Sequence, residues 1–168
     1  RRRTVFVSAS ANDFEPWGQA AVVDFAQTLG QALVADGARI ATGLGAGVGD
    51  ALFTGALREV MKQRGSSIEE SIIVRPFPQT GDPGELFAMW QAYRSEILSH
   101  CGIAIFLFGN KKDEDDVVPA DGLRREFELA LDQGIAVLPV GATGSMAKLI
   151  ADRMIDDPTI ARTRLGED

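Results

Sequence analysis

The chain has 168 residues, a formal net charge of −7 and a hydrophobic share of 45%. These values are typical of one globular domain that is large enough to bury a core. They argue against a surface built for broad nucleic-acid binding, which needs a basic face, and no apolar run reaches the roughly 18 residues of a membrane span.

Cys101 is the single cysteine and His100 the single histidine. One cysteine cannot form an internal disulfide and fits a reducing compartment, so we expect a cytoplasmic protein. A histidine-based metal site and a cysteine cluster are both excluded, so we expect no metal and no catalytic histidine base. The chain begins Arg1-Arg2-Arg3 without a methionine, which suggests that residues 1–168 are a single domain of a longer protein.

Apolar runs and helical patterns alternate along the chain. Five short runs, rich in β-branched and aromatic residues, predict strands: Thr4–Ser8, Ala38–Ala41, Ser71–Val74, Gly102–Phe108 and Ile135–Val140. Helical spacing of apolar residues predicts six helices: Gly18–Asp36, Asp50–Gln63, Glu85–Ser99, Leu123–Gln133, Met146–Met154 and Pro158–Leu165. The third of these helices is expected to bury one stripe: Leu86, Met89, Trp90, Tyr93 and Ile97.

This alternation specifies a parallel sheet with helices on both faces, joined by right-handed crossovers. The predicted fold class is therefore α/β, a Rossmann-like three-layer sandwich with a parallel sheet of five or slightly more strands. Ligands of such sheets bind outside the carboxyl ends of the strands. The loops expected at those ends are small, glycine-rich or charged: Ser8–Trp17, Gly43–Gly49, Arg75–Gly84, Gly109–Gly122 and Gly141–Ser145.

The Gly43–Gly49 loop has a glycine at every second position. Its backbone can approach a ligand closely, and the start of the helix behind it attracts anions such as phosphate. The loop matches neither the dinucleotide fingerprint nor the Walker motif, which disfavours a plain dehydrogenase or a P-loop NTPase. We expect a nucleotide or phosphorylated-ribose site, and close packing of helix on strand remains the structural alternative.

Three charged residues lie near predicted strand ends: Arg94, Lys111 and Glu126. Arginine binds phosphate with two parallel hydrogen bonds and lysine acts as a compact charge. A carboxylate beside them is suited to ribose hydroxyls, to a water, or to pairing a cation. From spacing alone, each of the three is more often an ordinary surface charge. Asp113–Asp116 predicts a solvated acidic loop, because a hard-metal site needs oxygens in fixed positions.

Several blocks of the chain resemble the SLOG superfamily, which includes the LOG phosphoribohydrolases and the Rossmann-like domain of DprA. The resemblance covers nearly the whole chain and is closest to the C-terminal SLOG domain of Thoeris-type anti-phage NADases. Its most specific part is the spacing between Tyr93-Arg94 and the Phe-Gly-Asn-Lys run that ends at Lys111. The blocks that carry it are Thr4–Ser10, Gly43–Gly49, Tyr93-Arg94, Ile103–Lys111 and Arg125–Phe127.

The resemblance implies a sensor rather than an enzyme, with no catalytic residue of its own. In that family the SLOG domain binds a cyclic ADP-ribose isomer made by a TIR protein, and it switches on a fused effector through rearranged oligomers. The effector here would be a SIR2 or TIR domain. No other cofactor, nucleic acid or membrane is expected. The ligand-binding arginine and lysine of that family fall on Arg94 and Lys111 here, and its acidic residue falls on Glu126. The expected ligand-binding residues are Ser8, Ala9, Ser10, Gly43, Leu44, Gly45, Gly47, Val48, Gly49, Arg94, Gly109, Asn110, Lys111 and Glu126.

The LOG enzymes, which cleave nucleoside monophosphates, are the catalytic alternative. They resemble this chain at Pro119–Glu126, where they carry a Pro-Gly-Gly-x-Gly-Thr-x-x-Glu loop. Here the second and third glycines and the threonine are missing, although the order of proline, glycine and glutamate survives. The part that grips phosphate is therefore lost, which favours binding without turnover. A structural or filament-forming domain without a ligand is a third possibility.

Overall fold

The computed structural model describes residues 3–63, 67–78 and 80–162. Five strands form one parallel sheet in the order β3-β2-β1-β4-β7. The predicted α/β class with a parallel five-stranded sheet is confirmed. The strands are β1 (Thr4–Ser10), β2 (Arg39–Thr42), β3 (Ile72–Val74), β4 (Ile103–Phe108) and β7 (Ala136–Pro139).

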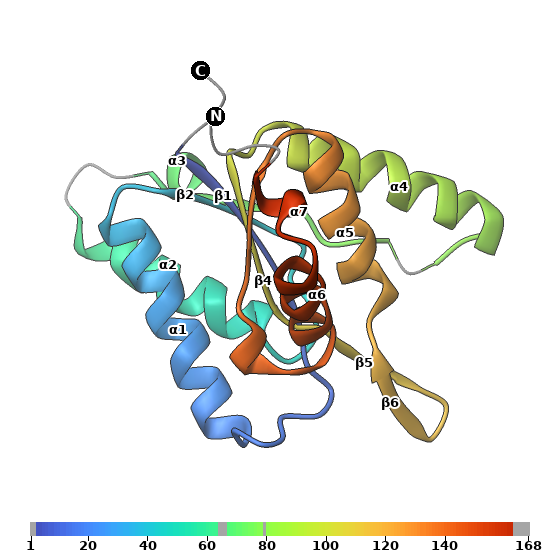
Figure 1. The fold of residues 1–168 in the computed structure, drawn as a ribbon. Helices are drawn as coiled ribbons and strands as arrows, with labels where there is room; N and C mark the ends of the chain where they lie inside the picture. The colour runs from blue at the N-terminus through green and yellow to red at the C-terminus, as the bar shows by residue number, and fades with distance from the viewer. Residues whose placement is uncertain (1–2, 64–66, 79, 163–168) are drawn as a thin grey trace.

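Helices cover both faces of this sheet, which gives the three layers expected from the sequence (Figure 1). On one face lie α1 (Gln19–Ala35) and α2 (Gly49–Lys62). On the other lie α4 (Pro83–Ser99), α5 (Asp121–Asp132) and α6 (Ser145–Asp156). Three short helical turns complete the described part: α3 (Ile68–Ser71), the 3₁₀ turn η1 (Gly141–Thr143) and α7 (Thr159–Arg162).

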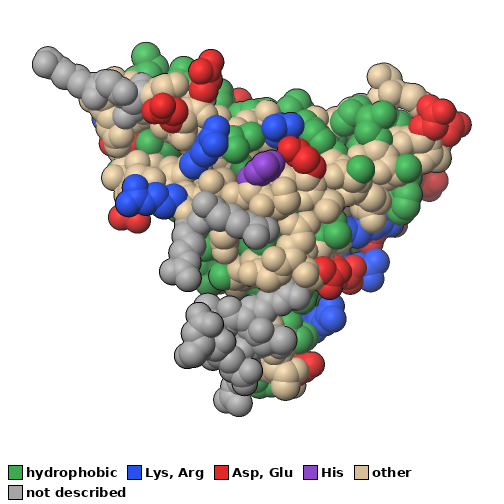
Figure 2. Space-filling model, turned by 90° about the horizontal axis from the view of Figure 1, so that it is seen from above, with side chains coloured by type: hydrophobic (Ala, Val, Ile, Leu, Met, Phe, Trp, Pro, Cys, Tyr) green, Lys and Arg blue, Asp and Glu red, His purple; other side chains and the backbone are tan. Residues whose placement is uncertain are grey.

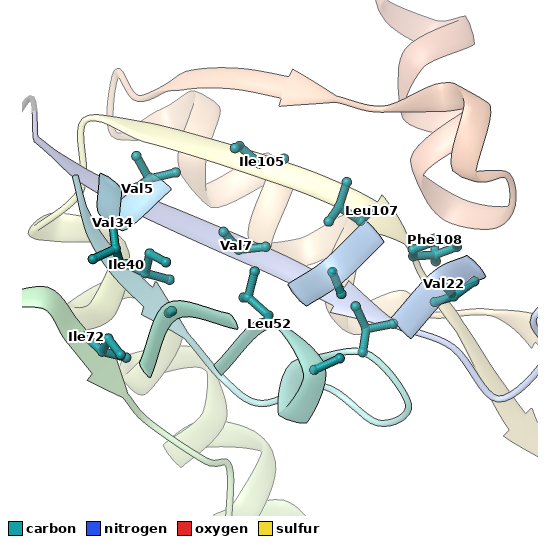
Figure 3. Close-up of a cluster of buried hydrophobic side chains, with 14 of the residues drawn as sticks. Val5, Val7, Val22, Val34, Ile40, Leu52, Ile72, Ile105, Leu107 and Phe108 are labelled. Carbon is teal, nitrogen blue, oxygen red and sulfur yellow. The ribbon is translucent and has the colours of Figure 1, made fainter. Parts of the chain in front are cut away.

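The two faces of β1 supply two hydrophobic cores, because successive side chains of a strand point to opposite sides. Val5 and Val7 point towards α1 and α2, where they join Leu52 in the cluster shown in Figure 3. Phe6 points the other way, into the cluster that holds Phe127 of α5. The sheet is therefore buried on both faces, as a parallel sheet requires.

α1 and α2 pack with their backbones in contact, because glycines stand where they meet. A β-carbon added to Gly30 would lie 2.2 Å from the carbonyl oxygen of Leu52. A β-carbon added to Gly55 would lie 1.9 Å from the carbonyl oxygen of Gln27. Any larger residue at either position would force the two helices apart.

β2 and β3 lie on one side of β1, and β4 and β7 lie on its other side, so the strand order reverses between β1 and β4. In open α/β sheets this reversal opens a crevice at the carboxyl ends of the strands. β1 extends to Ser10, two residues beyond its predicted end, because Ser10 still pairs with Phe108 of β4. Ala9 and Ser10 therefore belong to the strand and not to the loop in which the sequence placed them.

Residues 110–119, predicted as loop, form a two-stranded antiparallel hairpin of β5 (Asn110–Asp113) and β6 (Asp116–Pro119). The polar run Asn110–Asp113 and the adjacent valines of Asp116–Pro119 gave no apolar alternation to signal strands. The hairpin extends away from the sheet (Figure 1), and the predicted acidic stretch forms its exposed tip. As a result, the predicted site residues Asn110 and Lys111 lie on a strand and not in a loop.

The predicted inner stripe of α4 is partly wrong. Leu86 and Ile97 are buried, but Met89 is 51% exposed. The buried face of α4 includes Arg94 instead. A charged residue on an inward face was not expected from periodicity, and it needs a buried partner to be stable there.

The predicted last helix, Pro158–Leu165, corresponds to α7 as far as Arg162, and its remainder lies outside the described residues. Cys101 is buried in the core, as expected. Across residues 3–63, 67–78 and 80–162, none of the helices combines the length and apolar character that crossing a bilayer requires.

Candidate functional site

A cavity of about 140 Å³ opens at the carboxyl ends of the strands, beside the reversal of strand order. β1 supplies its floor through Ser8 to Ser10, and the loop after β2 supplies Gly43 and Gly45. Arg94 of α4 and Glu126 of α5 enter from the opposite layer. The fold thus brings together seven of the predicted site residues: Ser8, Ala9, Ser10, Gly43, Gly45, Arg94 and Glu126.

Glu126 is the centre of a buried hydrogen-bonded group. Its Oε2 accepts a hydrogen bond from the Ser8 hydroxyl at 2.5 Å, and its Oε1 accepts one from Arg94 Nε at 3.2 Å. All three residues are at most 9% exposed. The group joins β1, α4 and α5, which are distant in the sequence, so its geometry is fixed by the sheet and by two separate helices.

Arg94 is held by further contacts, which orient its guanidinium. Nη1 donates to the side-chain oxygen of Gln91 at 3.3 Å, and the guanidinium carbon lies 4.7 Å from the centre of the Phe77 ring. A β-carbon on Gly122 would lie 3.1 Å from Nη2. The arginine therefore reaches the first turn of α5, which no side chain caps. Cation and helix start together favour an anion at this point.

Burial raises the pKa of the Glu126 carboxyl, while the hydrogen bond from Ser8 and the charge of Arg94 act in the opposite direction. Desolvation is the largest of these effects, because a buried carboxylate loses its hydration. The fold consequently favours the protonated carboxyl relative to the unfolded chain. The resulting stabilisation is present below the ordinary carboxyl pKa and is lost as the pH rises through the raised value.

Glu126→Gln is therefore expected to weaken the dependence of folding stability on pH. The free energy of unfolding of the original chain should fall relative to that of the variant as the pH rises above the ordinary carboxyl pKa, because only the original chain has to ionise a buried carboxyl. Urea unfolding at several pH values measures this difference. Glu128→Gln is the matched control on the exposed side of the same helix. A difference between original chain and Glu126→Gln that stays constant with pH would contradict the expectation.

The glycine loop is packed mainly against protein backbone. A β-carbon on Gly45 would lie 1.7 Å from the carbonyl oxygen of Ala9, and one on Gly47 would lie 2.0 Å from that of Ala11. One on Gly49 would meet Leu44 at 2.5 Å. Leu44 itself has a φ of 54°, which is uncommon for a residue other than glycine. The predicted site residues Leu44, Gly47, Val48 and Gly49 shape the loop from outside the cavity lining.

Asn110 and Gly109 also lie outside the lining, and they hold the loop that follows β1. Asn110 Oδ1 accepts hydrogen bonds from the backbone N–H groups of Asn12 and Asp13, at 2.7 and 3.0 Å. Its Nδ2 donates to the carbonyl oxygen of Asp13 at 2.9 Å. The backbone N–H of Gly109 donates to Ser10. These contacts couple the exits of β1 and β4.

Lys111 lies on β5 at the outer edge of the site. Its Nζ is 3.4 Å from Oδ2 of Asp121, the first residue of α5, and its side chain is 45% exposed. The lysine is thus next to the helix start that Arg94 approaches from the inside. It reaches this position because Lys111 pairs with Val118 of β6, and β6 leads directly into α5.

Sequence reasoning missed six residues that line the cavity: Phe6, Val7, Phe77, Ala120, Gly122 and Leu123. Gly122 and Leu123 belong to the loop that resembles the LOG motif, and this resemblance could have placed them at the site. Phe77 follows β3 within a proline-rich segment, where an aromatic residue at a strand end was the only indication.

The histidine lies away from the cavity. His100 caps the carboxyl end of α4 before β4 begins, which places it at the amino end of the sheet. Figure 2 shows its purple side chain exposed among charged neighbours, and its Nε2 is 3.2 Å from Glu96. Within the described ranges, no group of three or more histidine, cysteine or acidic residues is placed to hold a metal ion. The charged residues that line the cavity are Arg94 and Glu126.

Comparison with known proteins extends these observations. A family model described as the Sir2- and TIR-associating SLOG family, STALD, matches residues 1–165. An NAD(+) hydrolase ThsA of Acinetobacter baumannii (strain 532279) is 38% identical over 164 residues, which are 94% of this chain and 34% of the relative. An NAD(+) hydrolase ThsA of Cytobacillus dafuensis is 41% identical over 158 residues, 92% of this chain and 32% of the relative. The chain thus spans about a third of the length of these curated relatives.

The fold has a counterpart among solved structures. The X-ray structure of the structural-genomics target TM1055 superposes with a TM-score of 0.64 at 16% sequence identity. The match covers 94% of this chain and 88% of the other. At this identity the likeness shows a shared fold.

Proposed function

The chain belongs to the Sir2- and TIR-associating SLOG family, and from this membership we propose that it is the sensor domain of an anti-phage defence protein. Its ligand would be a cyclic ADP-ribose isomer made by a TIR protein, and its output the activation of a fused NAD⁺ hydrolase. The relatives that it matches carry the name NAD(+) hydrolase. The proposed setting is the cytoplasm.

The observation that carries the proposal is the buried Ser8–Glu126–Arg94 group at the switch point of the sheet. A cyclic ADP-ribose isomer contains a pyrophosphate and two riboses. The Arg94 guanidinium, together with the uncapped start of α5, suits the pyrophosphate. The carboxyl of Glu126 and the hydroxyl of Ser8 suit ribose hydroxyls. The arrangement offers binding groups for both parts of the ligand within one cavity.

The alternative is a LOG-like hydrolase that releases the base of a nucleoside monophosphate. The departure from the LOG motif at the start of α5 argues against it. The buried glutamate is the one feature that would serve such a reaction. For this reason the sensor is the preferred function.

One experiment separates the two functions. The chain is titrated by calorimetry with cyclic ADP-ribose and with its linkage isomers, and it is incubated in parallel with AMP. A sensor binds one of the isomers with measurable heat and leaves AMP intact. Release of ribose 5-phosphate from AMP would establish the hydrolase, and no heat with any ADP-ribose compound would favour a structural domain.

Lys111→Ala is expected to weaken binding of that isomer about two- to fivefold, because an exposed cation contributes a screened attraction to the pyrophosphate. The loss should shrink as the salt concentration is raised. Calorimetry at two ionic strengths measures it. Lys112→Ala is the control, since neighbouring residues of a strand point to opposite faces. Equal losses in both variants would mean that general charge, and not the position of Lys111, is responsible.

Signalling needs a ligand that binds one assembly state more tightly than another, because equal affinity for both shifts no equilibrium. We therefore propose that the domain self-associates and that ligand binding changes the association of the parent protein. Sedimentation of the parent protein with and without the isomer tests this proposal.

A further inference from the structure

The cavity is smaller than the ligand proposed for it. Its volume is about 140 Å³, whereas pockets for drug-sized ligands measure roughly 300–1,000 Å³. A molecule with a base, two riboses and a pyrophosphate is therefore too large to be enclosed unless a wall moves outward. This step rests on the proposed function, which sets the size of the ligand.

Most walls of the cavity are fixed by the core. Gly45 packs directly against the backbone of Ala9, and the backbone N–H of Ala11 donates to the carbonyl oxygen of Ala46, so the glycine loop is tied to the end of β1. Glu126 lies next to Phe127, whose side chain is fully buried against the ring of Phe106. Moving β1, the glycine loop or α5 would disrupt close packing, which is costly.

Phe77 forms a wall of a different kind. It follows β3, an edge strand of the sheet, and lies between Pro76 and Pro78, which are both exposed. Its ring bridges the cavity from the glycine loop to α4: a β-carbon on Gly43 would lie 2.8 Å from the ring, and Tyr93 packs edge-on at 5.4 Å. The same ring lies against the guanidinium of Arg94.

We propose that Phe77 is an aromatic gate, which closes the cavity over Arg94 and swings out when a nucleotide-sized ligand enters. The ring then competes with the ligand's phosphates for the same guanidinium. Outward movement enlarges the cavity and exposes Arg94 in one step. Removing the ring should therefore increase affinity and association rate, although it deletes a contact. A stacking role on the base would have the opposite effect.

The first test needs no ligand. Ser8→Cys places a thiol on the cavity floor, and the only native cysteine, Cys101, is 1% exposed and gives a slow background. The rate of modification by a small methanethiosulfonate reagent should rise at least about tenfold when Phe77→Ala is added. Phe87→Ala is the matched control, because Phe87 packs against another arginine, Arg125, at 4.6 Å. Equal rates in the two backgrounds would overturn the gate.

The second test measures binding of the cyclic ADP-ribose isomers by calorimetry and stopped flow. Phe77→Ala should bind about three- to thirtyfold more tightly, the range expected when a competing cation–π contact is lost. Phe77→Leu keeps the apolar bulk and loses the aromatic face, so it should show a smaller gain in affinity. It replaces Phe77→Ala in this test if the alanine variant folds poorly. Weaker binding in both variants would overturn the gate. If the original chain binds none of the isomers, the proposed function fails, and the thiol experiment still decides whether Phe77 closes the cavity.

Discussion

Arg94→Ala is expected to reduce affinity for the cyclic ADP-ribose isomer by about a hundredfold or more. The guanidinium offers charge-assisted hydrogen bonds to the pyrophosphate, and each such bond contributes about 1.5–3 kcal/mol. The loss is large because Arg94 is already oriented by Glu126 and Gln91, so binding costs little ordering of the side chain. Calorimetry with the isomer measures the effect.

The control for Arg94→Ala has to separate binding from folding. Arg94 is buried and paired, and removing one partner of a buried ion pair costs about 3–5 kcal/mol when the other stays charged. Glu126 can take up a proton instead, which reduces that cost. The double variant Arg94→Met with Glu126→Gln removes both charges and should recover stability without recovering binding. Arg125→Ala, next to Glu126 on α5, should bind as the original chain does. Retained affinity in a folded Arg94→Ala variant would remove this residue from the site.

Gly45→Ala is expected to disrupt fold and site together. The added carbon would lie 1.7 Å from the carbonyl oxygen of Ala9, so the glycine loop would have to leave β1. We expect a loss of about 3 kcal/mol in the free energy of unfolding, at the upper end of overpacking effects, and a melting temperature lower by roughly 6–12 °C. Thermal and urea unfolding measure both quantities.

Gly37→Ala is the comparison for this steric effect. Gly37 has a φ of 76° and no atom within 4 Å of its added carbon, so only backbone strain opposes the substitution. That strain amounts to roughly 1–2 kcal/mol. If Gly45→Ala were no more damaging than Gly37→Ala, the contact between the glycine loop and β1 would not be the reason for the glycine.

The layered fold was predictable because its signals are local. Each strand of the sheet is a short apolar run and each main helix has its own periodic pattern, so a parallel sheet followed from their alternation. The β5–β6 hairpin was not predictable in this way. Its strands pair a polar, largely charged stretch with Asp116–Pro119, and no alternation of apolar residues distinguishes them from a loop.

The site was predictable at the level of loops and less so at the level of side chains. Ser8 and Glu126 are 118 residues apart in sequence, and no local pattern shows that they meet. Arg94 lies on a helix whose periodicity would place a charge outside, and its inward orientation depends on the distant glutamate. The alternating glycines indicated that a ligand comes close to the backbone of the loop. At Gly45 and Gly47, however, the group in close contact is the chain's own backbone, at Ala9 and Ala11.

The glycine contacts between α1 and α2 have a mechanical consequence. Helices whose backbones touch cannot rotate or slide without forcing a carbonyl oxygen against a carbon atom. α4 meets α5 through long side chains instead, such as Gln133 on Ser95 and Arg125 on Phe87. We therefore expect the side of the sheet that carries α1 and α2 to be the stiffer one. On the other side, α4 is the helix that we expect to shift most easily when a ligand enters at the end of β1.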